Sequence, residues 1–373
     1  MVVALLGLGT VGKAVYEAIR EGFLDIEIKY VLVRSPENKA IDKDLLVTDY
    51  NIILEDNEVE CVIEMMGASC SYEYMKRAIA ARKHVITANK EVIAMHYPEL
   101  KGLAILNDVE LLFEASVGGG IPIISTLLKE GMYNKVDRIE GILNGTTNFI
   151  LTSMHKEKID FSEALAIAQM RGFAEADPTA DLEGLDMVRK IAILSMIAYN
   201  SKIDLNKIYH MGITNVNKSI IEFIDLLGYR LKLMASSSLK NNIISISVEP
   251  TLVKADSLFA GVDYEYNLVR YNGSISGSQV MYGKGAGDKT ANSILYDLAN
   301  LAMKERVSFI PANTLCCNGN YDTFSKYLLE VNGKIDNNII EKRLGSMVIT
   351  KKISGLELEK LLPNVSFSAR FID

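Results

Sequence analysis

The chain has 373 residues, of which 49% are hydrophobic, and a formal net charge of -7. This length exceeds one ordinary core, so we expect two or three domains. The acidic balance, without a long basic run, argues against nucleic acid as a partner. No apolar segment reaches about 18 residues, which argues against a membrane span. Because Met1 leads directly into a strand pattern, we expect no signal peptide and a cytoplasmic protein.

The first residues predict a turn that binds a dinucleotide. An apolar run over residues 2–6 is followed by G-L-G-T-V-G and then by a helical pattern. In such a unit the first glycine permits a tight turn, the second lets a pyrophosphate approach the backbone, and the third lets helix pack on strand. We therefore expect the cofactor to contact Gly7, Gly9, Thr10, Val11 and Gly12; the alternative is a glycine turn without a ligand.

The end of the second predicted strand, residues 26–33, bears on the cofactor's identity. Arg34 follows it, where an NAD-binding protein would place an acidic residue to bind the ribose 2'-hydroxyl. A guanidinium suits a 2'-phosphate instead, so NADP is favoured over NAD, with Lys39 as a second candidate contact. The alternative is an NAD site with Arg34 in solvent.

Strand and helix patterns alternate up to residue 115, with strands at 59–67, 84–87 and 111–115. This alternation predicts a parallel sheet covered by helices, which binds ligands at the carboxyl ends of its strands. Gly67 and Lys90 follow two of these strands, so we expect Gly67 to contact the cofactor and Lys90 to lie near its nicotinamide end. A solvated surface lysine is the alternative for Lys90.

Residues 172–190 carry the strongest sign of a catalytic site. Asp186 and Lys190 lie four residues apart, on one face of a predicted helix whose continuation is apolar nearly all round. A buried ammonium must be paired or must hold its proton less tightly, and a lysine of the second kind can donate a proton near neutral pH. A weak surface ion pair is the alternative.

The middle of the chain predicts a second sheet. Residues 136–143, 243–250, 266–271 and 278–283 have strand patterns, and residues 220–234 have a helical one, which together suggest an open mixed sheet with helices on one face. Residues 144–148 offer polar groups to a ligand or cap a helix. Beyond residue 310 the patterns predict strand, helix, strand, helix, strand, with the first helix over 335–344.

The chain resembles the homoserine dehydrogenases across roughly residues 2–305. The resemblance rests on residues 7–12, 87–91, 114–122, 144–151, 172–190, 283–287 and 290–291, in matching order. It implies an NAD(P)-dependent interconversion of L-homoserine and L-aspartate 4-semialdehyde, in the branch toward threonine and methionine, by a homodimer.

The resemblance also implies roles for individual residues. Lys190 matches the proton donor to the aldehyde oxygen, and Lys90 matches a lysine beside the nicotinamide and the substrate. The matching substrate positions are Glu175, Asp186, Asp181, Gly145, Thr146 and Phe173, the last replacing a tyrosine of some members. Glu114, Val117, Gly119 and Ile121 match a loop that binds a monovalent cation, Na+ or K+, in some members; from the residues alone, a hinge is the alternative. Gly285 lies in a loop expected to complete the cofactor cleft.

The predicted architecture is α/β. An NAD(P)-binding domain spans residues 1–130 and 284–308, a catalytic and dimerisation domain with an open mixed sheet spans 131–283, and a small α+β module spans 309–373. This module resembles a shortened ACT domain, or is a plain structural appendage. Two other functions remain open: another NAD(P)-dependent amino-acid oxidoreductase, and a non-catalytic sensor of NADPH.

Overall fold

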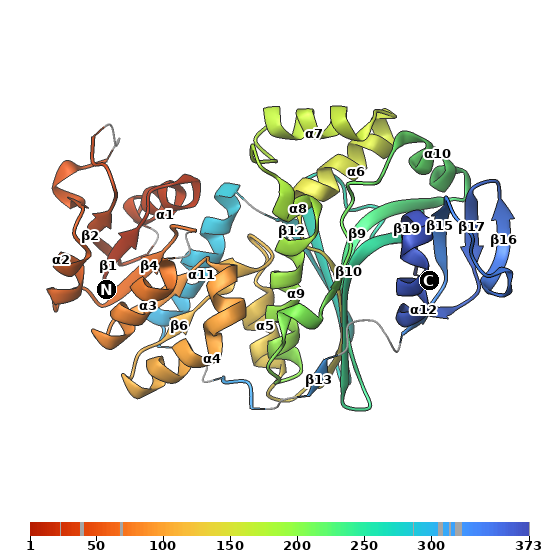
Figure 1. Cartoon of the computed structure of the whole chain (residues 1–373). Coiled ribbons are helices and arrows are strands. Elements are labelled where there is room, and N and C mark those ends of the chain that lie inside the picture. Colours follow the sequence, from red (N-terminus) through yellow and green to blue (C-terminus); the bar gives the residue numbers. More distant parts are fainter. Residues whose placement is uncertain are drawn as a thin grey trace. The chain divides into compact units, whose positions relative to one another are not determined.

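The computed structural model describes residues 1–22, 24–37, 41–67, 70–285, 287–304, 309–312, 315–317 and 323–372. The chain divides into two compact units (Figure 1). Unit 1 comprises Met1–Tyr133 and Gly283–Ala312, and unit 2 comprises Asn134–Tyr282 and Asn313–Asp373. Each unit has its own sheet and is described by itself.

Unit 1 contains a six-stranded sheet in the order β3-β2-β1-β4-β5-β6. All its pairings are parallel, which confirms the predicted parallel sheet. The strand order reverses between β1 and β4, and ligands bind at such points beyond the carboxyl ends of the strands. The strands are β1 (Val2–Leu6), β2 (Glu27–Leu32), β3 (Leu46–Val47), β4 (Cys61–Glu64), β5 (His84–Thr87) and β6 (Leu111–Leu112).

Apolar helix faces complete the core of unit 1. Val15 of α1 and Ile294 of α11 belong to one buried cluster with Leu5 of β1. The late helix α11 therefore packs with elements from the start of the chain, as Figure 1 shows. The helices are α1 (Thr10–Arg20), α2 (Tyr50–Glu55), α3 (Ser71–Ala80), α4 (Lys90–Leu106), α5 (Ile123–Glu130) and α11 (Thr290–Ala302).

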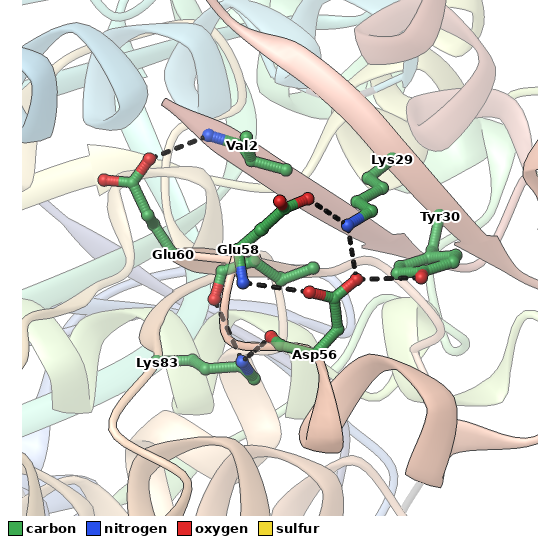
Figure 2. Close-up of polar contacts among 8 residues, drawn as sticks. Val2, Lys29, Tyr30, Asp56, Glu58, Glu60 and Lys83 are labelled. Carbon is green, nitrogen blue, oxygen red and sulfur yellow. Dashed lines mark hydrogen bonds and ion pairs between the residues drawn. The ribbon is translucent and has the colours of Figure 1, made fainter.

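A polar network closes the amino-terminal edge of this sheet (Figure 2). Asp56 accepts hydrogen bonds from the Tyr30 hydroxyl at 2.8 Å and pairs with Lys29 at 2.6 Å. These bonds lower the pKa of Asp56 to about 2, the one from Lys29 contributing most. Lys83 Nζ donates to the carbonyl oxygens of Asp56 and Val59 at 2.7 and 2.9 Å. The edge opposite the ligand-binding edge is thus held by side chains.

Unit 2 contains a mixed sheet of 11 strands, whose main path runs β12-β11-β7-β9-β10-β19-β15-β17-β16. Its centre is the long hairpin of β9 and β10, joined by Asn241 and Asn242 at φ 52° and 61°. Two left-handed residues of this kind fit the right-handed twist of the flanking strands. The path strands are β7 (Val136–Ile142), β9 (Tyr229–Lys240), β10 (Ile243–Lys254), β11 (Tyr266–Gly273), β12 (Gly277–Lys284), β15 (Tyr327–Val331), β16 (Ile340–Leu344), β17 (Met347–Thr350) and β19 (Val365–Phe371).

The C-terminal strands belong to this same sheet. β19 pairs with β10 through Thr251↔Arg370 and Leu252↔Phe371, and β15, β17 and β16 follow. Two short strands, β8 (Tyr209–His210) and β13 (Cys316–Cys317), also pair with β10, and β14 (Phe324–Ser325) pairs with β18 (Ile353–Ser354). The helices of unit 2 are α6 (Gly145–Glu157), α7 (Phe161–Met170), α8 (Thr179–Leu182), α9 (Leu185–Ala198), α10 (Lys218–Leu226) and α12 (Gly355–Leu361).

Two predicted helices are wrong in part. Residues 229–234 belong to β9, because Gly228 at φ 79° ends α10 and the following residues pair with β10. Residues 340–344 form β16, preceded by a single 3-10 turn, Asn337–Ile339, because they pair with β17. Their charged, mostly exposed side chains suit a strand at the edge of a sheet.

A buried histidine fixes α6 within unit 2. His155 Nδ1 lies 2.8 Å from Asp225 Oδ1, and its Nε2 accepts a hydrogen bond from the backbone N–H of Leu231 at 2.9 Å. Burial lowers the pKa of His155 to about 4. The imidazole is therefore neutral at pH 7 and links α6 to both α10 and β9.

Among the described residues, no helix is both long and apolar enough to cross a membrane.

Candidate active site

The glycine turn after β1 has the geometry that a dinucleotide requires. Gly7 has φ 97°, which side chains rarely tolerate, and a Cβ on Gly12 would lie 2.4 Å from the carbonyl oxygen of Gly7. A Cβ on Gly9, in contrast, would meet no atom within 4 Å. The first turn of α1, which begins at Thr10 and Val11, contains no acidic residue. The helix N-terminus is therefore open to a phosphate group.

A cavity of about 590 Å³ lies over this turn at the carboxyl edge of the sheet. Gly7 and Gly9 line one part of it and Arg34 and Ser35 another, so the predicted cofactor residues Gly7, Gly9 and Arg34 share one pocket. The size suits part of a dinucleotide. Lys39, the second candidate contact for a 2'-phosphate, lies outside the described residues.

The other predicted cofactor residues lie elsewhere in unit 1. Gly67 has φ 65° and is exposed after β4, and Lys90 is the half-buried first residue of α4. Gly285 touches the loop at Gly119, where a Cβ would come within 2.4 Å of the Gly285 backbone. These three residues do not line the cavity at Arg34.

A carboxylate that sequence reasoning missed organises the loops at this edge. Glu64, the last residue of β4, is fully buried. It accepts hydrogen bonds from the backbone N–H of Met66 at 2.8 Å, from the hydroxyl of Ser71 at 2.7 Å and from that of Thr87 at 2.6 Å. It thereby ties the loop that leads to Gly67 to the end of β5, just before Lys90. In the sequence, the only sign of this role is that a carboxylate ends an otherwise apolar strand.

The candidate cation loop, residues 114–121, is tightly bonded. The buried Glu114 carboxylate accepts the backbone N–H groups of Ile124 and Ser125, both at 2.7 Å, and burial raises its pKa. The carbonyl of Gly119 accepts the Ser293 hydroxyl at 2.6 Å. Val117 and Ile121 are buried, at 0% and 3% exposure. The Glu114 side chain therefore caps α5, which leaves backbone oxygens as the candidate cation ligands. In the described part of the chain, no group of three or more His, Cys, Asp or Glu residues is placed to hold a metal ion.

In unit 2, Lys190 is buried and paired. Its Nζ lies 2.7 Å from Asp186 Oδ2 and donates to the carbonyl oxygen of Leu143, also at 2.7 Å. Lys190 is 8% exposed and Asp186 4%. The predicted contact within one helix is therefore present, and it is an internal ion pair instead of a surface one.

Asn144 brings further predicted residues to Lys190. Its amide nitrogen donates to Asp181 at 2.6 Å and to Asp186 at 2.9 Å, while its oxygen accepts the backbone N–H of Thr147 at 2.8 Å and caps α6. The Thr146 hydroxyl, beside it on α6, donates to the carbonyl of Phe173 at 2.6 Å. A single amide thus holds two carboxylates together beside a lysine.

Gly145 and Glu175 complete the predicted substrate positions. Gly145 begins α6 next to Asn144, and a Cβ there would come within 3.2 Å of the Glu265 carbonyl, so the backbones approach closely. Glu175 is exposed, and its backbone carbonyl accepts a hydrogen bond from Gln169 at 3.2 Å. Its carboxylate has no hydrogen bond to Asn144 or Lys190 among the described contacts.

The parallel sheet, its glycine turn and the buried lysine with its carboxylates define a dinucleotide-dependent oxidoreductase. Comparison with known protein families identifies the particular family. The family model described as "Homoserine dehydrogenase, NAD binding domain" matches residues 7–114, and the model "Homoserine dehydrogenase" matches residues 122–299.

Individual proteins that are similar to this chain are also homoserine dehydrogenases. The chain is 39% identical to the homoserine dehydrogenase of Bacillus subtilis over 318 residues, which is 82% of this chain and 73% of the relative. It superimposes on the crystal structure of a homoserine dehydrogenase from Thiobacillus denitrificans with a TM-score of 0.90 at 30% identity, covering 100% of this chain and 98% of the other. A hyperthermophilic archaeal homoserine dehydrogenase in complex with NADPH matches with a TM-score of 0.72 at 25% identity, over 82% and 98% of the two chains.

The chain belongs to the homoserine dehydrogenase family. It is an NAD(P)-dependent oxidoreductase of amino-acid biosynthesis, which confirms the function expected from the resemblance. The predicted fold, a Rossmann-type sheet with a larger mixed sheet, is confirmed as well.

Proposed function

We propose that this enzyme interconverts L-homoserine and L-aspartate 4-semialdehyde with NADP, and that Lys190 donates the proton to the aldehyde oxygen. The observation that carries the proposal is the Lys190 ammonium, buried and held by Asp186 and Leu143. Of the three N–H groups of a lysine ammonium, these partners use two, so the third can reach a substrate oxygen. NADPH, when bound, supplies the hydride.

The geometry supports a catalytic role for Lys190, beyond a structural ion pair with Asp186. Reduction of an aldehyde places negative charge on its oxygen in the transition state, and a fixed ammonium stabilises that charge before it transfers the proton. Asp186 and the Leu143 carbonyl hold the Lys190 side chain in one place. Little reorganisation is then needed when the charge develops.

The paired carboxylates support an amino-acid substrate. Asp181 and Asp186 accept hydrogen bonds from the same nitrogen of Asn144, so one ammonium group can contact both. We assign them to the α-amino group of homoserine, which needs anionic partners in a buried pocket. We assign Glu175, exposed on the loop after α7, to the same group, and Gly145, Thr146 and Phe173 to the walls of the substrate pocket.

NADP is proposed over NAD because of Arg34. This exposed arginine lines the cavity above Gly7 and Gly9 together with Ser35 and Thr48. A guanidinium and two hydroxyl groups are good donors for a phosphate and leave a ribose hydroxyl without a carboxylate acceptor. We assign Gly67, Gly285 and the half-buried Lys90 to the rest of the cofactor, with Lys90 at its nicotinamide end.

Two further properties are part of the proposal. A monovalent cation, Na+ or K+, would bind the backbone oxygens of residues 114–121, since the Glu114 carboxylate already accepts hydrogen bonds from the N-terminus of α5.

The chain would act as a homodimer, because the mixed sheet of unit 2 offers a broad face for a second copy. Light scattering during size-exclusion chromatography measures the mass directly, and a monomer would contradict this assignment.

The reaction is tested by the absorbance of reduced nicotinamide. Purified protein with L-homoserine and NADP at alkaline pH, which draws off the released proton, should generate NADPH, and NAD should give a slower rate. The rate should not depend on ammonia, unlike that of an enzyme acting on a carbon–nitrogen bond. Folded protein that binds NADPH but shows no turnover in either direction would contradict the proposal.

A further inference from the structure

A second large cavity lies in unit 2, away from the Lys190 network. Its volume is about 660 Å³, which is ample for a small organic molecule. Strands β7, β11 and β19 contribute to its wall together with residues near β14, β16 and β17. Among the described residues, its lining includes five cationic side chains, Arg138, Arg270, Lys326, Lys352 and Arg370, and one acidic side chain, Glu341.

In the described part of the chain, the carboxylates around this cavity are fewer than its cations. Glu140 pairs with both Arg138 and Arg270, at 2.6 and 2.5 Å. The remaining pairs are Lys326 with Glu341 at 2.5 Å and Arg370 with Glu249 at 3.3 Å. Lys352 has no ion pair among the described residues. Among the described residues, three carboxylates therefore face five cations, an excess of two positive charges.

Arg370 is the buried cation of this cavity wall. It is 7% exposed, yet its Nε has no hydrogen-bond partner within the described structure. Its other contacts are the ion pair with Glu249 and a hydrogen bond from Nη2 to the Ser236 hydroxyl at 2.7 Å. The Nε is itself enclosed by protein, so an anion in the cavity can be bound only through the donors that Nη1 and Nη2 have left.

Apolar groups complete the wall. Phe371 lies edge-on to Tyr229 with ring centroids 5.2 Å apart, and both line the cavity. Phe324 also lines it and is 65% exposed, which is unusual for a large aromatic side chain. Such surfaces favour a ligand with a carbon skeleton over a bare inorganic ion.

We propose that this cavity binds a small organic dianion, a dicarboxylate or a phosphate monoester. Two negative charges would match the excess of positive charge among the described residues. Arg370 and Lys352 would donate to the anionic oxygens, and Phe324 would cover the carbon skeleton. Planar guanidinium groups bind carboxylate and phosphate equally well, so the geometry defines the charge and leaves the anion type to experiment.

The test is calorimetric titration of the full-length protein saturated with NADPH, so that the glycine turn is occupied. Succinate and phenyl phosphate serve as the two probes, at matched ionic strength. Saturable binding of one probe supports the proposal and identifies the anion type. No binding of either at millimolar concentration overturns it, and is the result expected if a second copy of the chain fills the cavity.

Matched variants locate the binding. Lys352→Gln removes an exposed cation from the wall and should weaken the bound probe about tenfold, the scale of one charge-assisted hydrogen bond. Lys342→Gln removes an exposed lysine of β16 that does not line the cavity, and should leave the affinity unchanged. Equal affinities of wild type and Lys352→Gln would place the probe elsewhere and overturn the proposal.

Discussion

At the scale of single residues, Asn144, Asp186 and Lys190 form one buried polar group at the candidate site. The spacing of Asp186 and Lys190 predicted their contact, and the apolar continuation of the helix predicted their burial. The sequence predicts a ligand site or a helix cap over residues 144–148, and Asn144 does cap α6. Asn144 also donates hydrogen bonds to Asp181 and Asp186, which lie 37 and 42 residues further along the chain. Such links depend on tertiary contacts, which periodicity does not encode.

Lys190→Ala tests the proton donor. We expect kcat to fall by about 10²- to 10⁴-fold, the usual contribution of a general acid, while the Kd for NADPH stays unchanged. Steady-state kinetics and a fluorescence titration measure the two quantities. Lys202→Ala, an exposed lysine just beyond α9, is the matched control and should keep full activity. If Lys190→Ala retained most of its kcat, the proton donor would have to be another group, with Lys90 the next candidate.

Arg34→Ala tests the cofactor preference. The variant should bind NADPH more weakly by about 1 to 3 kcal/mol, the scale of a lost hydrogen bond to a charged group, and NADH much less so. Arg20→Ala at the end of α1, outside the cavity lining, controls for a general loss of positive charge. An equal loss for both cofactors would mean that Arg34 does not contact a 2'-phosphate.

At the scale of elements, the strand and helix patterns were most reliable where one periodicity dominated. The strands β1, β2, β4, β5 and β6 of unit 1 and the strands β7, β10, β11 and β12 overlap the predicted ranges, whereas the two-residue strand β3 was not predicted. The predicted helix over residues 220–234 extends too far, because Gly228, a helix stop signal at φ 79°, ends α10 and residues 229–234 belong to β9. The pattern also failed for β16, because an exposed edge strand has no apolar alternation and is defined only by its pairing with β17.

The link between α6, α10 and β9 should make stability depend on pH. The folded protein disfavours protonated His155, whose pKa is lowered to about 4, whereas the unfolded chain titrates near 6.5. The unfolded state therefore binds more protons between these values, and stability falls as the pH falls through this window. From pH 7 to pH 5 we expect a loss of about 2 kcal/mol in the free energy of unfolding.

Urea titrations of unit 2 unfolding at pH 7 and pH 5 measure this loss. His155→Asn keeps an amide hydrogen for Asp225 but lacks the Nε2 acceptor for the Leu231 N–H, so it should be less stable at pH 7. Because asparagine cannot titrate, the variant should also lack the pH-dependent contribution of His155. Asp225 has a lowered pKa and stays ionised across this range. The same pH dependence in wild type and variant would assign the effect to other groups.

At the scale of the whole molecule, the C-terminal residues are part of the larger sheet of unit 2, a fact that local patterns could not show. Each of their strands was short and the partner strand, β10, lies more than a hundred residues earlier. Besides the backbone pairing, the buried ion pair of Arg370 with Glu249 joins β19 to β10. An ion pair of this kind gives little net stability, but loss of one partner leaves an uncompensated buried charge.

Arg370→Met should therefore lower the free energy of unfolding of unit 2 by about 3 to 5 kcal/mol, because Glu249, at 2% exposure, would lose its cationic partner. The double variant Arg370→Met/Glu249→Met should recover most of the loss, since apolar side chains of similar volume often replace a buried ion pair without cost. Chemical denaturation of the wild type, the two single variants and the double variant gives the coupling free energy of the pair. If the two single effects simply added, each residue would act independently, and the attachment of the C-terminal strands would rest on backbone pairing and apolar packing alone.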